Sequence, residues 1–387
     1  MKKLLVLIIL LALAIFGSQF VKNNNSNSII ENNKGEDVVV FPEEETDDIF
    51  NEYYNDALKL MKDMTLEEKI GQLFLVRYDV NTSTKQIKNY YAGGFVLFAK
   101  DFQNHTKETI TKELKDRQSV SKIPLALAVD EEGGYVTRVS RFPAFRSERF
   151  KSNRDLFETG GYDLVKTSEK EKAELLLGLG LNLNLAPVAD VSTNSNDYIN
   201  IRTFGRGANE TATFISNIVS YNNDAGISSS LKHFPCYGNN KDTHYGGAID
   251  NRSYDNFIKN DFLPFKSGID AGVPTILVSH NIVNSMDSEY PASLSKKVIN
   301  ELRNTLNFSG IVITDDLAMG AVSKYVNDNI GATLAINAGN DLIITSNFET
   351  MYNEVLNNVK SGIIKEEVID MAVLRILAWK CAYGIIK

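Results

Sequence analysis

The segment from Lys232 to His244 contains two of the four histidines of the chain and an aspartate, Asp242. It follows 227–231, a short apolar run that is typical of a buried strand. Polar residues that open a loop directly after a strand often have a functional role, because the strand is rigid and the loop is open to substrate. In this loop, the carboxylate of Asp242 can accept a hydrogen bond from the imidazole of His244 and stabilise its charged form. The pair could therefore carry a proton to and from a substrate.

Charged residues also follow other apolar runs of the sequence. Asp130 and Arg138 follow the run 125–129, and Arg202 follows 183–186. Lys232 and His233 follow 227–231, and Asp315 follows 311–313. If these runs are strands of one parallel barrel, their carboxyl ends surround a single mouth. We therefore expect these side chains to line one site.

Two of the chemistries that such residues allow have little support. Metal-dependent hydrolysis would use four candidate ligands, which are His233, Asp242, His244 and His280. However, a barrel metallohydrolase of the amidohydrolase kind needs His-x-His after its first strand, and here the first run ends at Arg77. A serine or cysteine nucleophile is disfavoured because there is no Gly-x-Ser-x-Gly motif, and Cys236 has no evident base beside it.

Glycoside hydrolysis with retention of configuration fits the residues better. It needs a carboxylate nucleophile and a proton donor about 5–5.5 Å apart. Asp315 could be the nucleophile, and a histidine such as His244 could supply the proton at neutral pH. Asp130 could accept hydrogen bonds from sugar hydroxyls, to which Arg202, Lys232 and His233 could donate. The alternative for the Asp242 loop is an ordinary polar turn, and Asp316 could cap a helix.

The elements that must position these residues alternate regularly along the chain. Apolar runs with the length of buried strands occur at 73–76, 94–98, 125–129, 183–186, 227–231, 275–278, 311–313 and 342–344. Stretches with helical periodicity lie between them, at 107–119, 163–179, 210–225, 257–271 and 295–306. Continuous apolar runs are typical of strands covered by helices on both faces. The pattern predicts a single (β/α)8 barrel, with a doubly wound open sheet as the alternative.

The composition and the N-terminus indicate an exported protein that does not bind nucleic acid. The chain has 387 residues, a net charge of −8 and two widely separated cysteines, which we expect to be free thiols. Lys2-Lys3 precede an apolar run, so residues 1–21 are predicted to be a signal peptide or an N-terminal membrane anchor. The Asn- and Ser-rich segment with the acidic cluster behind it, 22–46, is predicted to be a flexible linker. The barrel is expected to occupy 47–387.

The chain resembles the β-N-acetylglucosaminidase branch of the family 3 glycoside hydrolases. The segments that carry the resemblance are Met64–Gln72, Asp130–Arg138, Leu183–Asp190, Arg202–Gly205, Lys232–Pro235, Asp242–His244, Pro291–Ser295 and Thr314–Met319. They occur in the order found in the family and together span about residues 60 to 345.

The resemblance implies a retaining mechanism in which Asp315 is the nucleophile and His244, paired with Asp242, is the general acid and base. It also implies a set of sugar-binding residues, namely Asp130, Arg138, Arg202, Lys232 and His233. The implied substrate carries terminal β-linked N-acetylglucosamine, as peptidoglycan fragments with N-acetylmuramic acid do. The resemblance implies no metal or organic cofactor.

One segment departs from the family pattern. After Pro235 the family usually has a glycine, a basic residue and a second glycine, whereas this chain has Cys236-Tyr237-Gly238. The nucleophile and both residues of the Asp-His pair are present, so we expect an active enzyme. Two alternatives remain open: a family 3 β-glycosidase or phosphorylase of other specificity, and a surface-tethered glycan-binding protein without turnover.

Overall fold

Eight parallel strands form the centre of the computed structural model, which describes residues 48–240, 247–327 and 329–387. Their order in the sheet is β10-β1-β2-β3-β4-β5-β7-β9, and a bridge between Ile313 and Leu342 brings β9 and β10 together. The strands are β1 (Phe74–Arg77), β2 (Gly94–Leu97), β3 (Ala126–Val129), β4 (Leu183–Asn184), β5 (Ser228–Phe234), β7 (Thr275–Val278), β9 (Ile311–Thr314) and β10 (Ile343–Thr345). The sheet is therefore a nearly closed (β/α)8 barrel, as predicted.

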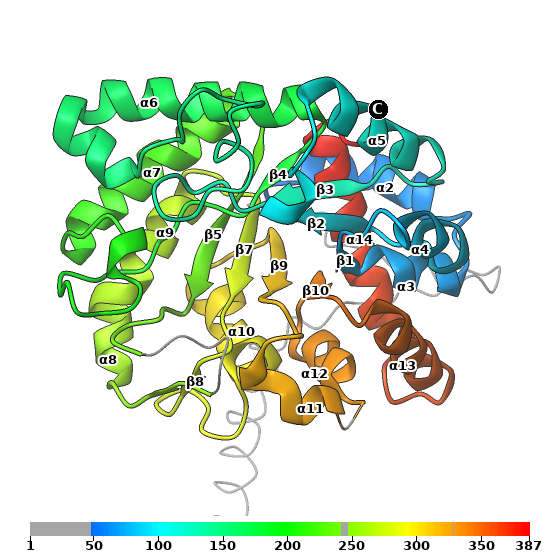
Figure 1. Ribbon diagram of the computed structural model, residues 1–387. Helices are drawn as coiled ribbons and strands as arrows, with labels where there is room; N and C mark the ends of the chain where they lie inside the picture. The colour runs from blue at the N-terminus through cyan, green and yellow to red at the C-terminus, as the bar shows by residue number, and fades with distance from the viewer. Residues whose placement is uncertain (1–47, 241–246, 328) are drawn as a thin grey trace, which may run out of the picture. The chain divides into compact units, whose positions relative to one another are not determined.

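Helices surround the barrel and cover the outer faces of its strands (Figure 1). The α-helices are α2 (Tyr54–Met61), α3 (Leu66–Gln72), α4 (Ser83–Tyr90), α5 (Lys107–Ser119), α6 (Asn153–Leu179), α7 (Ala208–Asp224), α8 (Tyr254–Asn256), α9 (Phe262–Asp270), α10 (Lys296–Asn300), α11 (Ser323–Asn327), α12 (Gly331–Ala338), α13 (Phe348–Lys360) and α14 (Glu366–Ala382). Two π-helical turns, η4 (Phe257–Asp261) and η6 (Glu301–Thr305), adjoin α9 and α10. Within the described ranges, no helix combines the length and the apolar character that a bilayer span needs.

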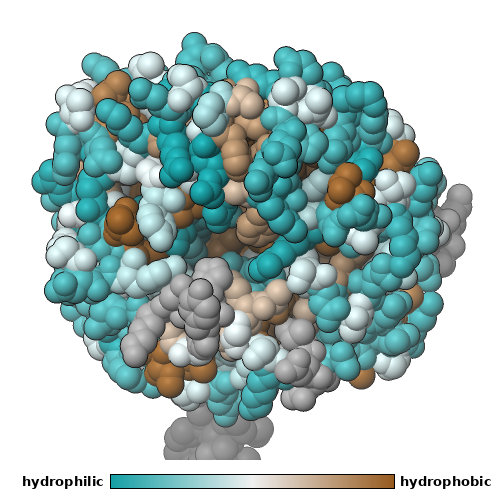
Figure 2. Space-filling view, viewed as in Figure 1, coloured by the Kyte–Doolittle hydropathy of each residue, from teal (hydrophilic) through white to brown (hydrophobic). Residues whose placement is uncertain are grey.

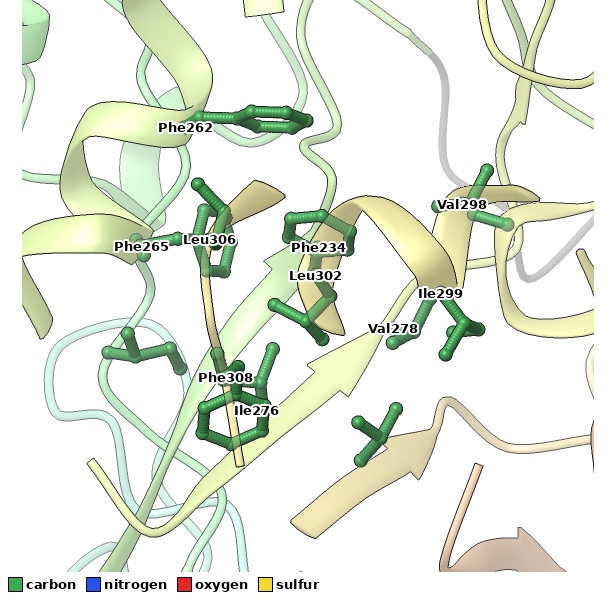
Figure 3. Close-up of a cluster of buried hydrophobic side chains, with 14 of the residues drawn as sticks. Phe234, Phe262, Phe265, Ile276, Val278, Val298, Ile299, Leu302, Leu306 and Phe308 are labelled. Carbon is green, nitrogen blue, oxygen red and sulfur yellow. The ribbon is translucent and has the colours of Figure 1, made fainter. Parts of the chain in front are cut away.

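A large apolar cluster lies between the strands and the helices on one side of the barrel. Phe234 of β5 and Ile276 and Val278 of β7 pack there with Phe262 of α9 and Leu302 of η6 (Figure 3). All five side chains are at most 3% exposed. The strands are continuous apolar runs because their outer faces bury side chains against helices while their inner faces fill the barrel.

The predicted elements correspond closely to the observed ones. All eight predicted strands are present, with ends shifted by three residues or fewer, and α5 has the predicted bounds. Thr65 caps α3 through a capping box with Glu68, as the sequence indicates. The long helix α6 begins ten residues before the predicted start, and Gly160 and Gly161 interrupt its helical backbone. The short strands β6 (Ile249–Asp250) and β8 (Ile282–Val283) were not predicted.

Candidate active site

A cavity of about 230 Å³ opens at the carboxyl ends of the barrel strands. Figure 2 shows this face of the molecule, with a hollow near its centre and hydrophilic side chains around much of it. The charged residues that line the cavity are Arg77, Asp130, Glu132, Arg138, Arg202, Lys232, Asp315 and Asp316, accompanied by His233 and by the aromatic residues Phe98, Tyr135, Tyr198 and Tyr237. These residues come from the ends of β1, β2, β3, β5 and β9 and from the loops that follow β3, β4 and β5.

A chain of ion pairs forms one wall of the cavity. The ammonium group of Lys232 lies 2.7 Å from Oδ1 of Asp130 and 2.7 Å from Oε1 of Glu132. Arg202 donates to both oxygens of Glu132, at 2.7 and 3.0 Å. Burial, the largest single influence, would raise the pKa of Asp130, but the charges of Lys232 and Arg138 and the hydrogen bond from Lys232 together outweigh it and lower that pKa. Burial is likewise outweighed at Glu132, where Arg202 and Lys232 hold the pKa well below its ordinary value. Both carboxylates are therefore ionised at neutral pH.

The orientation of His233 is fixed by a buried carboxylate, Asp190. Oδ2 of Asp190 accepts from the backbone N–H of His233 at 3.0 Å and lies 2.7 Å from Nδ1 of its ring. On the other side, Nε2 of His233 is 3.2 Å from Nη2 of Arg202, which can only donate. We therefore assign the proton to Nδ1, with Nε2 as an acceptor. The sequence predicts that His233 donates to a sugar, whereas in this arrangement its two ring nitrogens already have partners.

Strand β5 presents two consecutive side chains to the cavity. Lys232 pairs with Leu277 of β7 and Phe234 pairs with Val278, so His233 is an extra residue in the ladder. Such a bulge changes the direction of a side chain relative to regular strand alternation. Lys232 and His233 consequently both line the cavity.

Asp315 stands at the opposite wall, directly after β9. Its backbone N–H donates to the carbonyl of Val278 at 2.8 Å, and its Oδ1 accepts from the backbone N–H of Asp316 at 2.8 Å. Asp316 is buried, accepts from the N–H of Ala318 at 2.8 Å and forms an ion pair with Arg77. Asp315 itself is half-buried and faces the cavity, so its carboxylate is accessible to a ligand.

The buried carboxylate of Glu131 holds the loop that follows β3. Its oxygens accept from the backbone N–H groups of Arg138 and Val139, both at 2.7 Å, and from the N–H and hydroxyl of Ser140. Glu131 is 0% exposed and does not line the cavity. It therefore fixes the backbone at Arg138, whose side chain does line it.

Six of the eight predicted site residues line this one cavity. They are Asp130, Arg138, Arg202, Lys232, His233 and Asp315. The other two, Asp242 and His244, lie outside the described residues. Sequence reasoning missed the roles of Glu132, Asp190 and Arg77, although Arg77 ends β1, Glu132 follows β3 closely and Asp190 lies in the loop after β4. The position after a strand could have identified them, but not their pairing.

The alternative chemistries find little support in the described part of the chain. His280 is buried, with Nδ1 2.7 Å from the hydroxyl of Ser293 and Nε2 3.0 Å from the carbonyl of Asp316. Within that part, no three His, Cys, Asp or Glu side chains are grouped so that they could hold a metal ion. Burial, together with the neighbouring carboxylate of Asp261, raises the pKa of the Cys236 thiol well above its ordinary value, so Cys236 is a poor nucleophile. Cys236 and Cys381 are both free thiols.

Of the two residues at which the chain departs from the family pattern, Cys236 and Tyr237, only Tyr237 lines the cavity. The ring of Tyr237 packs edge-on against that of His233, with centroids 4.8 Å apart, and its backbone N–H donates to Oδ1 of Asp190 at 2.6 Å. The next residue, Gly238, has a φ of +57° and lies against Arg252, whose guanidinium would clash with a side chain there. Tyr237 therefore adds an aromatic surface beside His233, and both residues are held by the carboxylate of Asp190.

Comparisons with known proteins point to one family. The model of the glycosyl hydrolase family 3 N-terminal domain matches residues 65–379. A beta-hexosaminidase of Nitrosomonas eutropha is 30% identical over 72% of this chain and 80% of its own length. Among solved structures, a family 3 β-N-acetylglucosaminidase from Paenibacillus is 28% identical with a TM-score of 0.77, over 83% of this chain but only 63% of that one. A β-N-acetylhexosaminidase from Beutenbergia cavernae is 26% identical with a TM-score of 0.74, over 83% of this chain and 99% of that one.

Proposed function

The chain belongs to glycosyl hydrolase family 3, and we propose that it is a retaining exo-β-N-acetylglucosaminidase. The observation that carries the proposal is that Asp315 shares one cavity with Asp130, Arg138, Arg202, Lys232 and His233. A carboxylate facing a set of fixed donors and acceptors suits the binding and cleavage of a sugar ring. Its relatives named beta-hexosaminidase support the choice of N-acetylglucosamine, and peptidoglycan fragments that end in N-acetylglucosamine linked to N-acetylmuramic acid are the proposed substrates.

In the proposed first step, an oxygen of Asp315 attacks the anomeric carbon of the bound sugar. The bond from that carbon to the leaving oxygen breaks, and His244, supported by Asp242, gives that oxygen a proton. The sugar is then held as an ester of Asp315. In the second step His244 removes a proton from water, the water oxygen bonds to the anomeric carbon and the carboxylate of Asp315 leaves. Two inversions give net retention of configuration.

The fixed charges of the ion-pair wall would position the sugar for this attack. Asp130 keeps oxygen lone pairs for sugar hydroxyls, because its ion-pair partners among the described residues are the cations Lys232 and Arg138. Charged groups that are already oriented need little reorganisation when the substrate binds. We assign these residues to sugar binding and Asp315 to catalysis.

We also propose that the protein works outside the cytoplasm. The apolar segment within residues 1–21 supports export, either with release or with a tether to the outer face of the membrane. The segment 22–46 would then separate the barrel from the membrane.

Turnover of a chromogenic aryl β-N-acetylglucosaminide by the purified protein tests the proposed function, followed by the same measurement on Asp315→Ala. We expect turnover by the wild-type protein and a loss of at least about 1,000-fold in kcat for the variant, because the covalent step has no nucleophile. Substantial residual activity would remove Asp315 from this role. Sugar binding without turnover by the wild-type protein would instead identify a glycan-binding protein.

A further inference from the structure

Arg77 brings uncommitted donor groups to the cavity. It is the last residue of β1, and its Nε forms the ion pair with Asp316 that fixes the plane of the guanidinium. Nη1 and Nη2 donate no hydrogen bond to any residue in 48–240, 247–327 or 329–387. The side chain is 39% exposed. Arg77 therefore presents the Nη1–Nη2 edge of its guanidinium to the cavity or to the solvent at its mouth.

A second guanidinium, that of Arg138, lies near the same aromatic ring. The Cζ atoms of Arg77 and Arg138 are 5.2 and 5.7 Å from the ring centroid of Phe98. Among the described residues, the carboxylate oxygen that forms an ion pair with Arg138 belongs to Asp130 and lies 3.7 Å from Nη2, which is longer than a hydrogen bond. Nε of Arg138 is buried and has no partner in the part of the chain that the structure describes. Such an orphaned buried donor is costly unless a ligand satisfies it.

These two arginines differ from the other cations of the cavity. Lys232 is shared between Asp130 and Glu132, and Arg202 uses two of its nitrogens on Glu132. The uncommitted cationic donors are thus concentrated on the wall formed by β1, β2 and the loop after β3. A guanidinium edge matches the paired oxygens of a carboxylate or phosphate better than it matches a single hydroxyl.

We propose that Arg77 binds an oxyanion at the edge of the sugar site, next to the sugar-binding residue Arg138, and that Arg77 determines specificity for it. The inference rests on the proposed glycosidase function. Two sources share this chemistry. One is a carboxylate on the leaving part of the substrate, such as the lactyl group of N-acetylmuramic acid. The other is inorganic phosphate as the acceptor, in which case a phosphate oxygen bonds to the anomeric carbon, the bond to Asp315 breaks and a sugar 1-phosphate is released.

The test compares N-acetylglucosaminyl-β-1,4-N-acetylmuramic acid with its methyl ester, which lacks the charge. For the wild-type protein we expect kcat/KM to be about 10-fold or more higher for the acid, as a charge-assisted hydrogen bond gives. In Arg77→Met this preference should fall to about 2-fold or less, since the guanidinium edge is absent. Arg77→Lys keeps a cation for Asp316 without the planar edge and should show an intermediate preference.

The phosphate arm uses the same proteins with the chromogenic substrate and inorganic phosphate. If phosphate is the ligand, the wild-type protein forms the sugar 1-phosphate, Arg77→Met forms at least about 10-fold less, and acid and ester react alike. The matched control is Arg141→Met, which removes an exposed arginine that does not line the cavity and should behave as wild type in both arms.

Two results would overturn the subsite. In the first, Arg77→Met lowers kcat/KM for acid and ester equally and leaves the response to phosphate unchanged, so that Arg77 only supports Asp316. In the second, calorimetry on Asp315→Ala, which leaves the disaccharide intact, finds equal affinity for acid and ester and no binding of phosphate. Because calorimetry needs no turnover, it tests the subsite even if the proposed hydrolysis fails. Melting temperatures establish that each variant is folded.

Discussion

At the scale of single residues, two buried carboxylates, Asp190 and Glu131, organise the site without lining the cavity. Asp190 is 1% exposed and accepts hydrogen bonds from two backbone N–H groups and from the ring of His233. Glu131 accepts from three backbone N–H groups of its own loop. Each carboxylate holds the backbone next to a side chain that lines the cavity. Both therefore act through other residues.

Asp190→Asn tests this positioning role. An amide has one acceptor oxygen and places its NH2 group opposite an N–H donor, so His233 or Tyr237 loses its partner. We expect kcat/KM to fall about 10- to 100-fold, because leaving one such donor unsatisfied costs about 1–3 kcal/mol. Nitrogen-15 spectra of histidine-labelled protein should show the Nδ1–H tautomer of His233 in the wild type and a mixture in the variant. Asp116→Asn, on the exposed face of α5, is the control. An unchanged His233 tautomer in the variant would contradict the role.

At the same scale, the sequence could predict positions but not pairings. Asp130, Arg202, Lys232 and Asp315 were predicted as site residues because each follows an apolar run, and all four line the cavity. The link from Lys232 to both Asp130 and Glu132 joins residues about one hundred positions apart. Such contacts depend on how adjacent strands are staggered, and one-dimensional periodicity carries no information about that.

At the scale of elements, the loop after β3 depends on close backbone approach. Gly133 has a φ of +94°, and a Cβ atom there would lie 2.4 Å from the carbonyl oxygen of Lys151. The adjacent Gly134 donates to the carbonyl of Phe150 at 2.8 Å. This contact joins the start of the loop, where Glu132 faces the cavity, to the segment just before α6. The two glycines therefore allow the cavity wall to pack against the entry to a helix.

Gly133→Ala should destabilise both the fold and the site. The left-handed backbone and the clash with Lys151 together should lower the free energy of unfolding by about 2–4 kcal/mol, and kcat/KM should fall because Glu132 moves. The matched control is Gly178→Ala on α6, where a Cβ atom meets nothing within 4 Å. That variant should be more stable by about 0.5–1 kcal/mol. Urea unfolding measures both, and equal effects of the two substitutions would refute the argument.

The elements that sequence reasoning missed are those that periodicity does not encode. Strands β6 and β8 have two residues each and pair with one another, so they are too short to carry a repeated pattern. The early part of α6 was missed because Gly160 and Gly161 interrupt the periodicity, although Ser152 caps the helix through the N–H of Asp155. Long, continuous apolar runs were predicted well, because burial on both faces leaves a direct signature in the sequence.

At the scale of the whole molecule, helix α14 is joined to the end of the barrel at which β2 and β3 begin. Lys380 of α14 is 1% exposed and donates to the side chain of Gln72 at 2.8 Å and to the carbonyls of Gly93 and Pro124, both at 2.9 Å. These acceptors lie at the end of α3 and just before β2 and β3. A single side-chain nitrogen therefore ties the C-terminal helix to three segments from the N-terminal half of the barrel.

Burial lowers the pKa of Lys380 to about 7, and this shift predicts a pH dependence of stability. In the unfolded chain a lysine titrates near 10.4, so between about pH 7 and 10 the unfolded state binds a proton that the folded state has released. The folded state is therefore favoured increasingly as the pH rises through this window. In Lys380→Met there is no proton to release. The stability of the wild type relative to this variant should accordingly increase by about 2 kcal/mol from pH 7 to pH 9.

Urea unfolding of the wild type, Lys380→Met and Lys115→Met at both pH values measures this difference. Lys115 is exposed on α5, so the stability of the wild type relative to Lys115→Met should not change with pH. The comparison with a variant removes the contributions of cysteines and tyrosines that titrate in the same range. If the difference for Lys380→Met is also independent of pH, the three acceptors keep Lys380 charged in the folded state up to pH 9. The group would then act as a buried cation held by oxygen atoms alone, and its pairing would outweigh its burial.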